Sequence, residues 1–426
     1  MYQVGVAVIQ LLVMTCVARS LSVENNGVFV VGLLISNVLA NTMLLGLNTS
    51  NIYFLKARKI SLNQMLFKNL QYWLLMVFVV SPIIYILLLD FGAVVFPGIK
   101  LEVLTAAIVL FVFMLANVLI HSIFQAVDRF DLFNKYLLFN VVMQLISLLT
   151  LVYFDLITSL YGIYALIFAT SLCFFCGIAH MFFIKKHMLP KDVIKNQPVK
   201  SFYKFGFKSH LSNIIAFLMS RADVYMLNYF ISPASSAVYM VAVLFVERLG
   251  MVSQSLATVI FPDLAALSGD EKKQHMLMCK AFRLNAIVTC VVAGLVSIFI
   301  YPAIYVLFGL KYLSATEVFF ILVLGVILKS GSRILSVFIT AVGKPEMNFY
   351  MALIAIMLNI TLNYLLIPKF GVYGAAIATT VSYMVNFVIR LVVLRSVVFR
   401  APLSELRPTK VDLEYILSYL PPKRSG

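Results

Sequence analysis

The stretch VFFILVLGVILKSGSRILSVFITAV, residues 318–342, has the length and apolarity of a membrane span but carries Lys329 and Arg333 near its middle. A helix needs about 20 apolar residues to cross a bilayer. A charge at the centre of such a helix costs roughly 2.5–3.5 kcal/mol on insertion scales, so it indicates a function. Because residues four apart share one helical face, both cations are expected to face the same wet or protein-enclosed space.

The composition indicates that the whole chain is a membrane protein. Of its 426 residues, 62% are hydrophobic and 12% are charged, and the mean hydropathy is +1.01. Soluble domains are nearer one half apolar and one quarter charged. The apolar residues fall in long uninterrupted runs, which favours an all-α polytopic protein over a β-barrel with alternating residues.

The apolar runs predict about twelve membrane-spanning helices in two six-helix bundles. The six expected spans of the first half are residues 3–18, 27–47, 70–89, 103–124, 136–154 and 162–184. Those of the second half are residues 206–230, 237–262, 281–308, 315–342, 349–367 and 373–398. We therefore expect an N-terminal bundle over 1–184, a basic cytoplasmic linker over 185–205, a C-terminal bundle over 206–398 and a cytoplasmic tail with an amphipathic helix over 399–426.

The loops between these spans differ sharply in positive charge. One alternate set holds four basic residues, and the other set holds eighteen, including the lysines of the linker. The positive-inside rule places the basic set, and with it both termini, in the cytoplasm. The formal net charge of +16 is therefore explained by membrane orientation, and we expect no nucleic-acid partner.

Three short matches in chain order relate the two halves at nearly one offset. The matched pairs are residues 162–170 with 371–379, 26–29 with 236–239, and 126–136 with 341–350. A six-span unit ends on the side of the membrane where it began, so the second copy enters with the same orientation. Transporters built from such parallel repeats bind substrate between the halves near the midplane.

Six charges inside the predicted spans are the candidate site residues. They are Lys329, Arg333, Arg221 and Arg248, which would bind substrate, and Asp223 and Glu247, which would balance charge or couple to an ion. Arg19 and Arg390 are further cationic candidates near span ends. The six carry a net charge of +2, and an external anion is the natural complement of positive charge held in a bilayer.

Two interpretations of Lys329 and Arg333 stay open. In the first, they bind an anion such as a pyrophosphate or an acidic sugar, and Gly331 between them lets backbone or a ligand approach closely and bends the helix. In the second, both side chains only snorkel or lie in a water-filled vestibule. The sequence contains no nucleotide-binding glycine loop, and its predicted outer loops are too short for a catalytic site. We therefore expect a transporter without a cofactor or a metal ion, and not an enzyme.

Several motifs resemble those of bacterial oligosaccharide flippases in the polysaccharide-transporter branch of the multidrug/oligosaccharidyl-lipid/polysaccharide exporter superfamily. In the first half they are Ala18-Arg19-x-Leu21 with Glu24, Gly27 and Phe29. In the middle they are Arg221-x-Asp223, Tyr229-Phe230, Tyr239-x-x-Ala242 and Phe261-Pro262. The last third has Gly343-Lys344-Pro345 and Gly371-x-x-Gly374-Ala375-Ala376-x-Ala378-Thr379. The chain departs from the family pattern at Asn228 and Ala237, where such proteins commonly have glycine.

The resemblance implies two bundles around a central cationic cavity in a bacterial cytoplasmic membrane. It also implies a cargo of an O-antigen or capsule repeat unit on undecaprenyl pyrophosphate, turned from the inner to the outer leaflet. Membrane lipid, a coupling H⁺ or Na⁺ and other polysaccharide-assembly proteins are further partners that it suggests. Two alternatives remain: a drug or cation antiporter of the same architecture, and a membrane polymerase or ligase acting on lipid-linked sugars.

Overall fold

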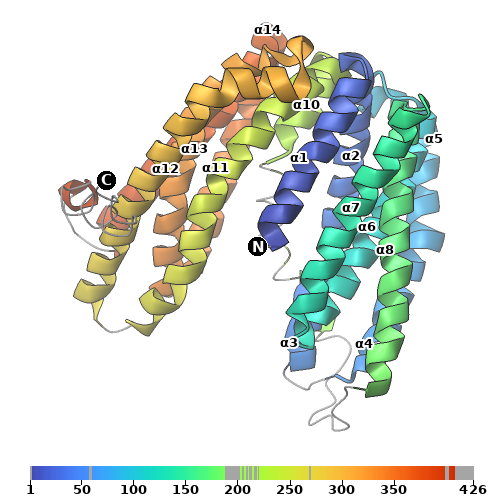
Figure 1. Cartoon of the computed structure of the whole chain (residues 1–426). Helices are drawn as coiled ribbons and strands as arrows, with labels where there is room; N and C mark the ends of the chain where they lie inside the picture. Colours follow the sequence, from blue (N-terminus) through green and yellow to red (C-terminus); the bar gives the residue numbers. More distant parts are fainter. Residues whose placement is uncertain are drawn as a thin grey trace, which may run out of the picture. The chain divides into compact units, whose positions relative to one another are not determined.

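The structure is a computed structural model that describes most of the chain (Figure 1). The described residues are 2–56, 60–187, 202–203, 206–207, 210, 214, 218, 220–267, 270–398 and 403–407. Every regular element among them is a helix, which confirms the predicted all-α class. The chain divides into two compact units, Met1–Ala237 and Val238–Gly426, here called unit 1 and unit 2.

Unit 1 is built from long helices that pack on one another. They are α1 (Tyr2–Ser20), α2 (Val23–Met43), α3 (Leu47–Lys56), α4 (Leu62–Leu75), the π-helix η1 (Met76–Val80), α5 (Ser81–Val95), α6 (Leu101–Ala126), α7 (Phe130–Tyr153), α8 (Ser159–His187) and α10 (Ala222–Phe230). Helix α6 is the central element because it packs against α2, α3, α5 and α8. Most of its side chains are buried, whereas α5 has one buried residue, Gly92.

Unit 2 contains fewer and longer helices. They are α11 (Pro233–Ala266), which begins in the last residues of unit 1, α12 (Glu271–Phe308), η2 (Leu310–Tyr312), α13 (Ala315–Ala341), α14 (Pro345–Val393), η3 (Leu394–Val398) and η4 (Leu403–Leu406). Helix α13 packs against both α12 and α14. This central position buries one face of α13 and leaves Lys329 and Arg333 on its more exposed side.

The helices agree with the predicted spans except at particular boundaries. Nine helices of the described residues are long and apolar enough to span a membrane. Helix α14 holds two predicted spans, 349–367 and 373–398, separated by a kink at Gly371 with φ of 56° and ψ of −130°. Helix α1 is a shorter apolar helix, and the predicted span 206–230 lies largely outside the described residues.

The predicted start of the third span at residue 70 was wrong by eight residues. The helical run begins at Leu62, where Ser61 and Gln64 form a capping box that satisfies the first backbone N–H groups. The first turns of α4 are polar, so hydropathy alone did not include them. The short helix α3 was also not predicted.

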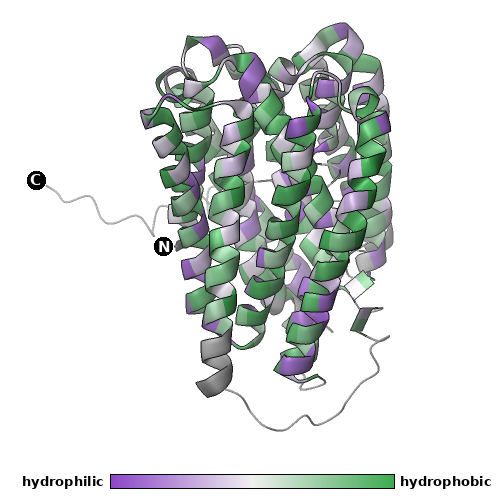
Figure 2. Cartoon of the chain, turned by 90° about the vertical axis from the view of Figure 1, so that its right-hand side faces the viewer, coloured by the Kyte–Doolittle hydropathy of each residue, from purple (hydrophilic) through white to green (hydrophobic). Residues whose placement is uncertain are grey.

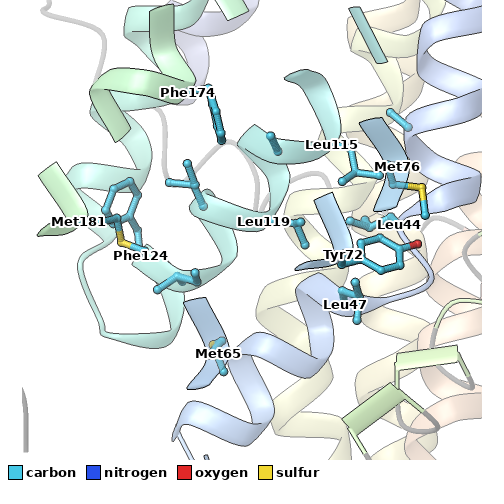
Figure 3. Close-up of a cluster of buried hydrophobic side chains, with 14 of the residues drawn as sticks. Leu44, Leu47, Met65, Tyr72, Met76, Leu115, Leu119, Phe124, Phe174 and Met181 are labelled. Carbon is cyan, nitrogen blue, oxygen red and sulfur yellow. The ribbon is translucent and has the colours of Figure 1, made fainter. Parts of the chain in front are cut away.

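Apolar packing among α2, α3, α4, α6 and α8 forms the larger buried cluster of unit 1. Figure 3 shows Leu44, Tyr72 and Met76 gathered near Leu115 of α6. The polar ends of two aromatic side chains bond to backbone acceptors: the buried Tyr72 hydroxyl donates to the Met43 carbonyl, and the half-buried Trp73 indole N–H donates to the Val112 carbonyl at 3.1 Å. These two bonds satisfy the Tyr72 hydroxyl and the Trp73 indole inside unit 1.

The outer faces of many helices are apolar, as expected for contact with lipid. Phe78 and Ile83 on the η1–α5 run are exposed, and so are Ile298 and Phe299 on α12. In Figure 2 hydrophobic residues cover most of the length of the helices that face the viewer. Exposed apolar surface on this scale marks a membrane contact in place of an aqueous one.

The predicted domain limits fall partly on residues outside the described ranges. The linker 185–205 and the tail 399–426 are described only at residues 185–187, 202–203 and 403–407. The amphipathic tail helix lies outside the described residues. The limits at 184 and 206 and the positions of both termini stay predictions.

Candidate functional site

Helix α13 presents Lys329 and Arg333 on one side, one turn apart. Both side chains are half-buried, whereas Ser330, Gly331 and Ser332 between them are buried. The Ser253 hydroxyl of α11 donates to the Ser330 hydroxyl at 2.7 Å, which fixes the buried face against α11. The four-residue spacing therefore works as predicted: it places both cations on the more exposed face of a buried helix.

The side chain of Tyr383 on α14 holds Lys329 in place. The Lys329 Nζ donates to the Tyr383 hydroxyl at 2.8 Å and lies 4.3 Å from the centroid of the same ring. The phenol thus supplies an oxygen acceptor and a negative ring face to a cation held at membrane depth. Tyr383 was not among the predicted site residues, because residues 54 positions apart give no periodic signal.

The prediction for Gly331 was wrong. Helix α13 runs unbroken through this position, and a Cβ there would lie 3.0 Å from the Phe387 ring and 3.1 Å from the Phe282 ring. These two rings stack on each other with centroids 6.2 Å apart. Gly331 faces away from the cations, so its missing side chain admits aromatic packing instead of a ligand.

Arg390 is buried in a polar network that joins α13 to both parts of α14. Its Nε donates to the Asn386 side chain at 2.7 Å, and its Nη1 donates to the Asn348 side-chain oxygen. The Asn348 amide in turn donates to the Ser336 carbonyl at 3.0 Å and to the Thr340 hydroxyl at 2.9 Å. These contacts indicate that the Arg390 guanidinium stabilises the packing of α13 and α14. The sequence had predicted Arg390 as a further cationic site residue.

Arg248 and Glu247 lie on α11, within unit 2. Glu247 is exposed and Arg248 is half-buried, and the Arg248 Nη1 lies 3.9 Å from the sulfur of Met251 one turn further on. Adjacent residues on a helix point in different directions, so these two charges face different surroundings.

Arg221 and Asp223 pack within unit 1, although the sequence predicted them in the second half. Arg221 precedes α10 and donates to the Ser220 carbonyl at 3.3 Å. Asp223 is buried in the first turn of α10, and its carboxylate accepts from the Val224 N–H at 2.8 Å. A carboxylate at a helix N-terminus is favourable by charge–dipole interaction. Arg19 is exposed in the last turn of α1.

An apolar cavity of about 340 Å³ lies in unit 1 beside Arg221. Its walls come from α2, α5 and the start of α10, and they include Leu34, Leu88 and Tyr225. A cavity of this size and lining is suited to a hydrocarbon chain more than to a polar group.

A buried polar cluster in unit 2 was also missed. The Asn363 amide donates to the Asn359 oxygen at 3.0 Å, the Asn359 amide donates to the Thr379 hydroxyl at 3.3 Å, and the Tyr239 hydroxyl lies 3.5 Å from the same oxygen. The Asn363 Oδ1 has no hydrogen-bond partner among the described residues. Amide and hydroxyl oxygens of this kind can coordinate a hard cation.

Residues 56–419 match the family described as lipid II flippase MurJ. The chain belongs to the MurJ family. This family is one of lipid flippases and not of enzymes, in agreement with the prediction of a transporter. Its match runs through both units and includes every candidate site residue except Arg19.

Solved structures confirm the fold of this MurJ-family chain. "Lipid II flippase MurJ, inward closed conformation" superposes with a TM-score of 0.72 at 15% identity, covering 98% of this chain and 90% of that one. An inward-facing multidrug resistance MATE transporter of the MOP superfamily superposes with a TM-score of 0.68 at 14% identity, covering 91% and 93%. The predicted all-helical transporter fold is therefore confirmed.

A curated relative of this MurJ-family chain is the "Probable low-salt glycan biosynthesis flippase Agl15" of Haloferax volcanii. It is 27% identical over 203 residues, which are 47% of this chain and 43% of the relative. The match thus spans less than half the length of that relative.

Proposed function

We propose that this chain is a flippase that carries an oligosaccharide repeat unit on undecaprenyl pyrophosphate from the inner to the outer leaflet. The observation that carries the proposal is the cationic face of α13, where Lys329 and Arg333 lie one turn apart beside Tyr383. Membership of the MurJ family and similarity to a glycan biosynthesis flippase support a lipid-linked glycan as cargo. An O-antigen or capsule unit in a bacterial inner membrane is the cargo we favour.

The chemical reason lies in the charge of the cargo. A pyrophosphate group cannot cross hydrocarbon unaided because an unsolvated ion is very costly there. Arg333 offers a planar fork of donors that matches phosphate oxygens, and Lys329 offers a compact point charge. Tyr383 uses one ammonium proton of Lys329, which leaves two others able to reach an anion.

The remaining predicted site residues extend this proposal. Arg221 and Arg248 add positive charge, and Asp223 and Glu247 orient these cations or respond to a coupling ion. Arg19 is an additional cation that contacts the anionic cargo as it crosses the membrane. The net charge of +2 on the six span residues favours an anionic cargo and opposes the drug or cation antiporter alternative, which would favour acidic residues.

The test is to neutralise the α13 cations together. Lys329→Gln with Arg333→Gln should abolish surface polysaccharide and trap single repeat units on the inner leaflet, while the protein level in the membrane stays unchanged. The charge-matched control is Lys272→Gln with Arg395→Gln, two exposed residues of the same unit, and it should export normally. Normal polysaccharide in the first variant would refute the assignment.

The same strain distinguishes the cargo. Loss of this chain should block a surface polysaccharide while lipid II still reaches the outer leaflet. If loss of this chain instead stops lipid II from reaching the outer leaflet, the cargo is lipid II, after which the family is named. Repeat units that accumulate on the outer leaflet would point to the polymerase or ligase alternative.

Of the two coupling ions considered, Na⁺ is the one we favour. The buried Asn363 Oδ1 accepts no hydrogen bond among the described residues and does not titrate, so it suits a metal cation. H⁺ coupling needs a titrating group, and of the two acidic candidates Asp223 accepts from the Val224 N–H while Glu247 is exposed. Export in vesicles should therefore depend on a Na⁺ gradient at constant pH, and Asn363→Ala should weaken that dependence. Thr361→Ala, an exposed position on the same helix, is the control. Export driven equally well by a pH gradient without Na⁺ would oppose this choice.

A further inference from the structure

We propose that His275, Cys279 and Glu405 form a Zn²⁺ site that fastens the segment after the last span to helix α12. His275 and Cys279 are one turn apart on α12, and Glu405 lies on η4. The ligand atoms of the three side chains all lie within 4.8 Å of one another. Nothing in the flippase activity proposed above uses this cluster.

The distances between the ligand atoms are close to the edges of a zinc tetrahedron. Zinc bonds of about 2.0–2.1 Å to nitrogen or oxygen and about 2.3 Å to sulfur place tetrahedral ligand atoms roughly 3.3–3.6 Å apart. In the structure the His275 Nδ1 lies 3.4 Å from the Glu405 carboxylate, and the Cys279 sulfur lies 3.8 Å from the same Nδ1 and 3.5 Å from Nε2. Rotation of the Cys279 and Glu405 side chains about their χ angles would bring the three ligand atoms onto one ion.

The chemistry of the three ligands selects zinc among the common divalent ions. A thiolate and an imidazole favour Zn²⁺, whereas Mg²⁺ and Ca²⁺ favour sets made of oxygen atoms. The thiolate and the carboxylate together carry two negative charges, which neutralise the two positive charges of one Zn²⁺. A fourth position would remain for water, as three protein ligands allow.

The protein already holds the ligands in place. His275 and Cys279 are only 6% and 2% exposed. The Arg283 Nη1 donates to the backbone carbonyl of Glu405 at 2.8 Å, and Leu406 is buried in the apolar cluster that includes Cys279. These contacts bring η4 to α12 without a metal, so the ion would bind a preformed site and strengthen the attachment.

The experiment measures zinc in the full-length protein, purified in detergent without a polyhistidine tag. We expect one Zn²⁺ per chain, a rise in the temperature of unfolding on adding Zn²⁺, and protection of Cys279 from a thiol reagent. Cys279→Ser should weaken Zn²⁺ binding by at least ~10-fold, since even outer-shell changes cost 10–100-fold. Glu405→Gln should weaken it as well.

The matched control is Cys290→Ser, because Cys290 is an exposed cysteine on the same helix. It should bind Zn²⁺ like the unchanged protein. Zinc binding that is absent in the unchanged protein, or that Cys279→Ser and Cys290→Ser alter equally, would overturn the proposal. Co²⁺ substitution adds a separate reading: a cobalt–thiolate absorption band should appear in the unchanged protein and in Cys290→Ser but not in Cys279→Ser.

Discussion

The ammonium group of Lys329 donates a 2.8 Å hydrogen bond to the Tyr383 hydroxyl and lies 4.3 Å from the centroid of that ring. One side chain thus contributes both an oxygen and an aromatic face to the same cation. A lysine near the middle of a membrane span is costly unless such groups replace part of its water. The contact also aims the ammonium group, because the ring and the hydroxyl restrict it together.

Removing the hydroxyl of Tyr383 should weaken cargo binding without unfolding the protein. Tyr383→Phe keeps the ring face and loses one hydrogen bond, which is worth about 1 kcal/mol, or about fivefold in apparent affinity for the lipid-linked glycan. Tyr383→Leu loses both contacts and should have a larger effect. The measurement is export in reconstituted vesicles as a function of cargo concentration.

The control for this pair is Tyr350→Phe, an exposed tyrosine on the same helix, which should export normally. Equal export by the unchanged protein and Tyr383→Leu would show that this phenol does not position Lys329 for the cargo.

The sequence was sufficient to predict the helix that carries Lys329 and the face on which Arg333 joins it. Both followed from hydropathy and a four-residue spacing, which are local properties. Tyr383 could not be predicted in the same way, because its contact with Lys329 depends on how α14 packs on α13. Gly331 was misassigned for a related reason: its neighbours Phe282 and Phe387 come from two other helices.

Arg390 should matter more for stability than for cargo. Arg390→Gln removes a buried guanidinium and leaves the side chains of Asn348 and Asn386 without their shared donor. Buried groups left unsatisfied in this way cost about 1–3 kcal/mol. We expect a lower temperature of unfolding in detergent, measured by intrinsic fluorescence or by a thiol-reactive dye.

Arg395→Gln is the matched control because Arg395 is an exposed arginine near the end of the same helical run. Its effect should stay within about 0.5 kcal/mol, as is usual for surface positions. If the two variants unfold at the same temperature, the network around Arg390 contributes little to stability.

The cluster of His275, Cys279 and Glu405 could not be predicted from local sequence patterns. His275 and Cys279 have a spacing that places both on one helical face, yet this pair alone is a weak signal. Glu405 lies 126 residues after Cys279, so its approach to α12 becomes visible only in the folded chain. Hydropathy and residue spacing predicted the membrane spans, but they could not predict the network around Arg390 or the His–Cys–Glu cluster, because both join distant parts of the chain.

Gly371 should be intolerant of any side chain, whereas Gly294 should accept alanine with a gain. The backbone at Gly371 has φ of 56° and ψ of −130°, a region nearly restricted to glycine, and this conformation turns the chain between the two halves of α14. Gly371→Ala should therefore cost about 1–3 kcal/mol of stability. At Gly294, inside α12, an added Cβ meets no atom within 4 Å, so Gly294→Ala should stabilise the helix by about 0.5–1 kcal/mol. The temperatures of unfolding of the two variants, measured side by side in one detergent, should move in opposite directions, and a shift of the same sign in both would contradict a strained kink at Gly371.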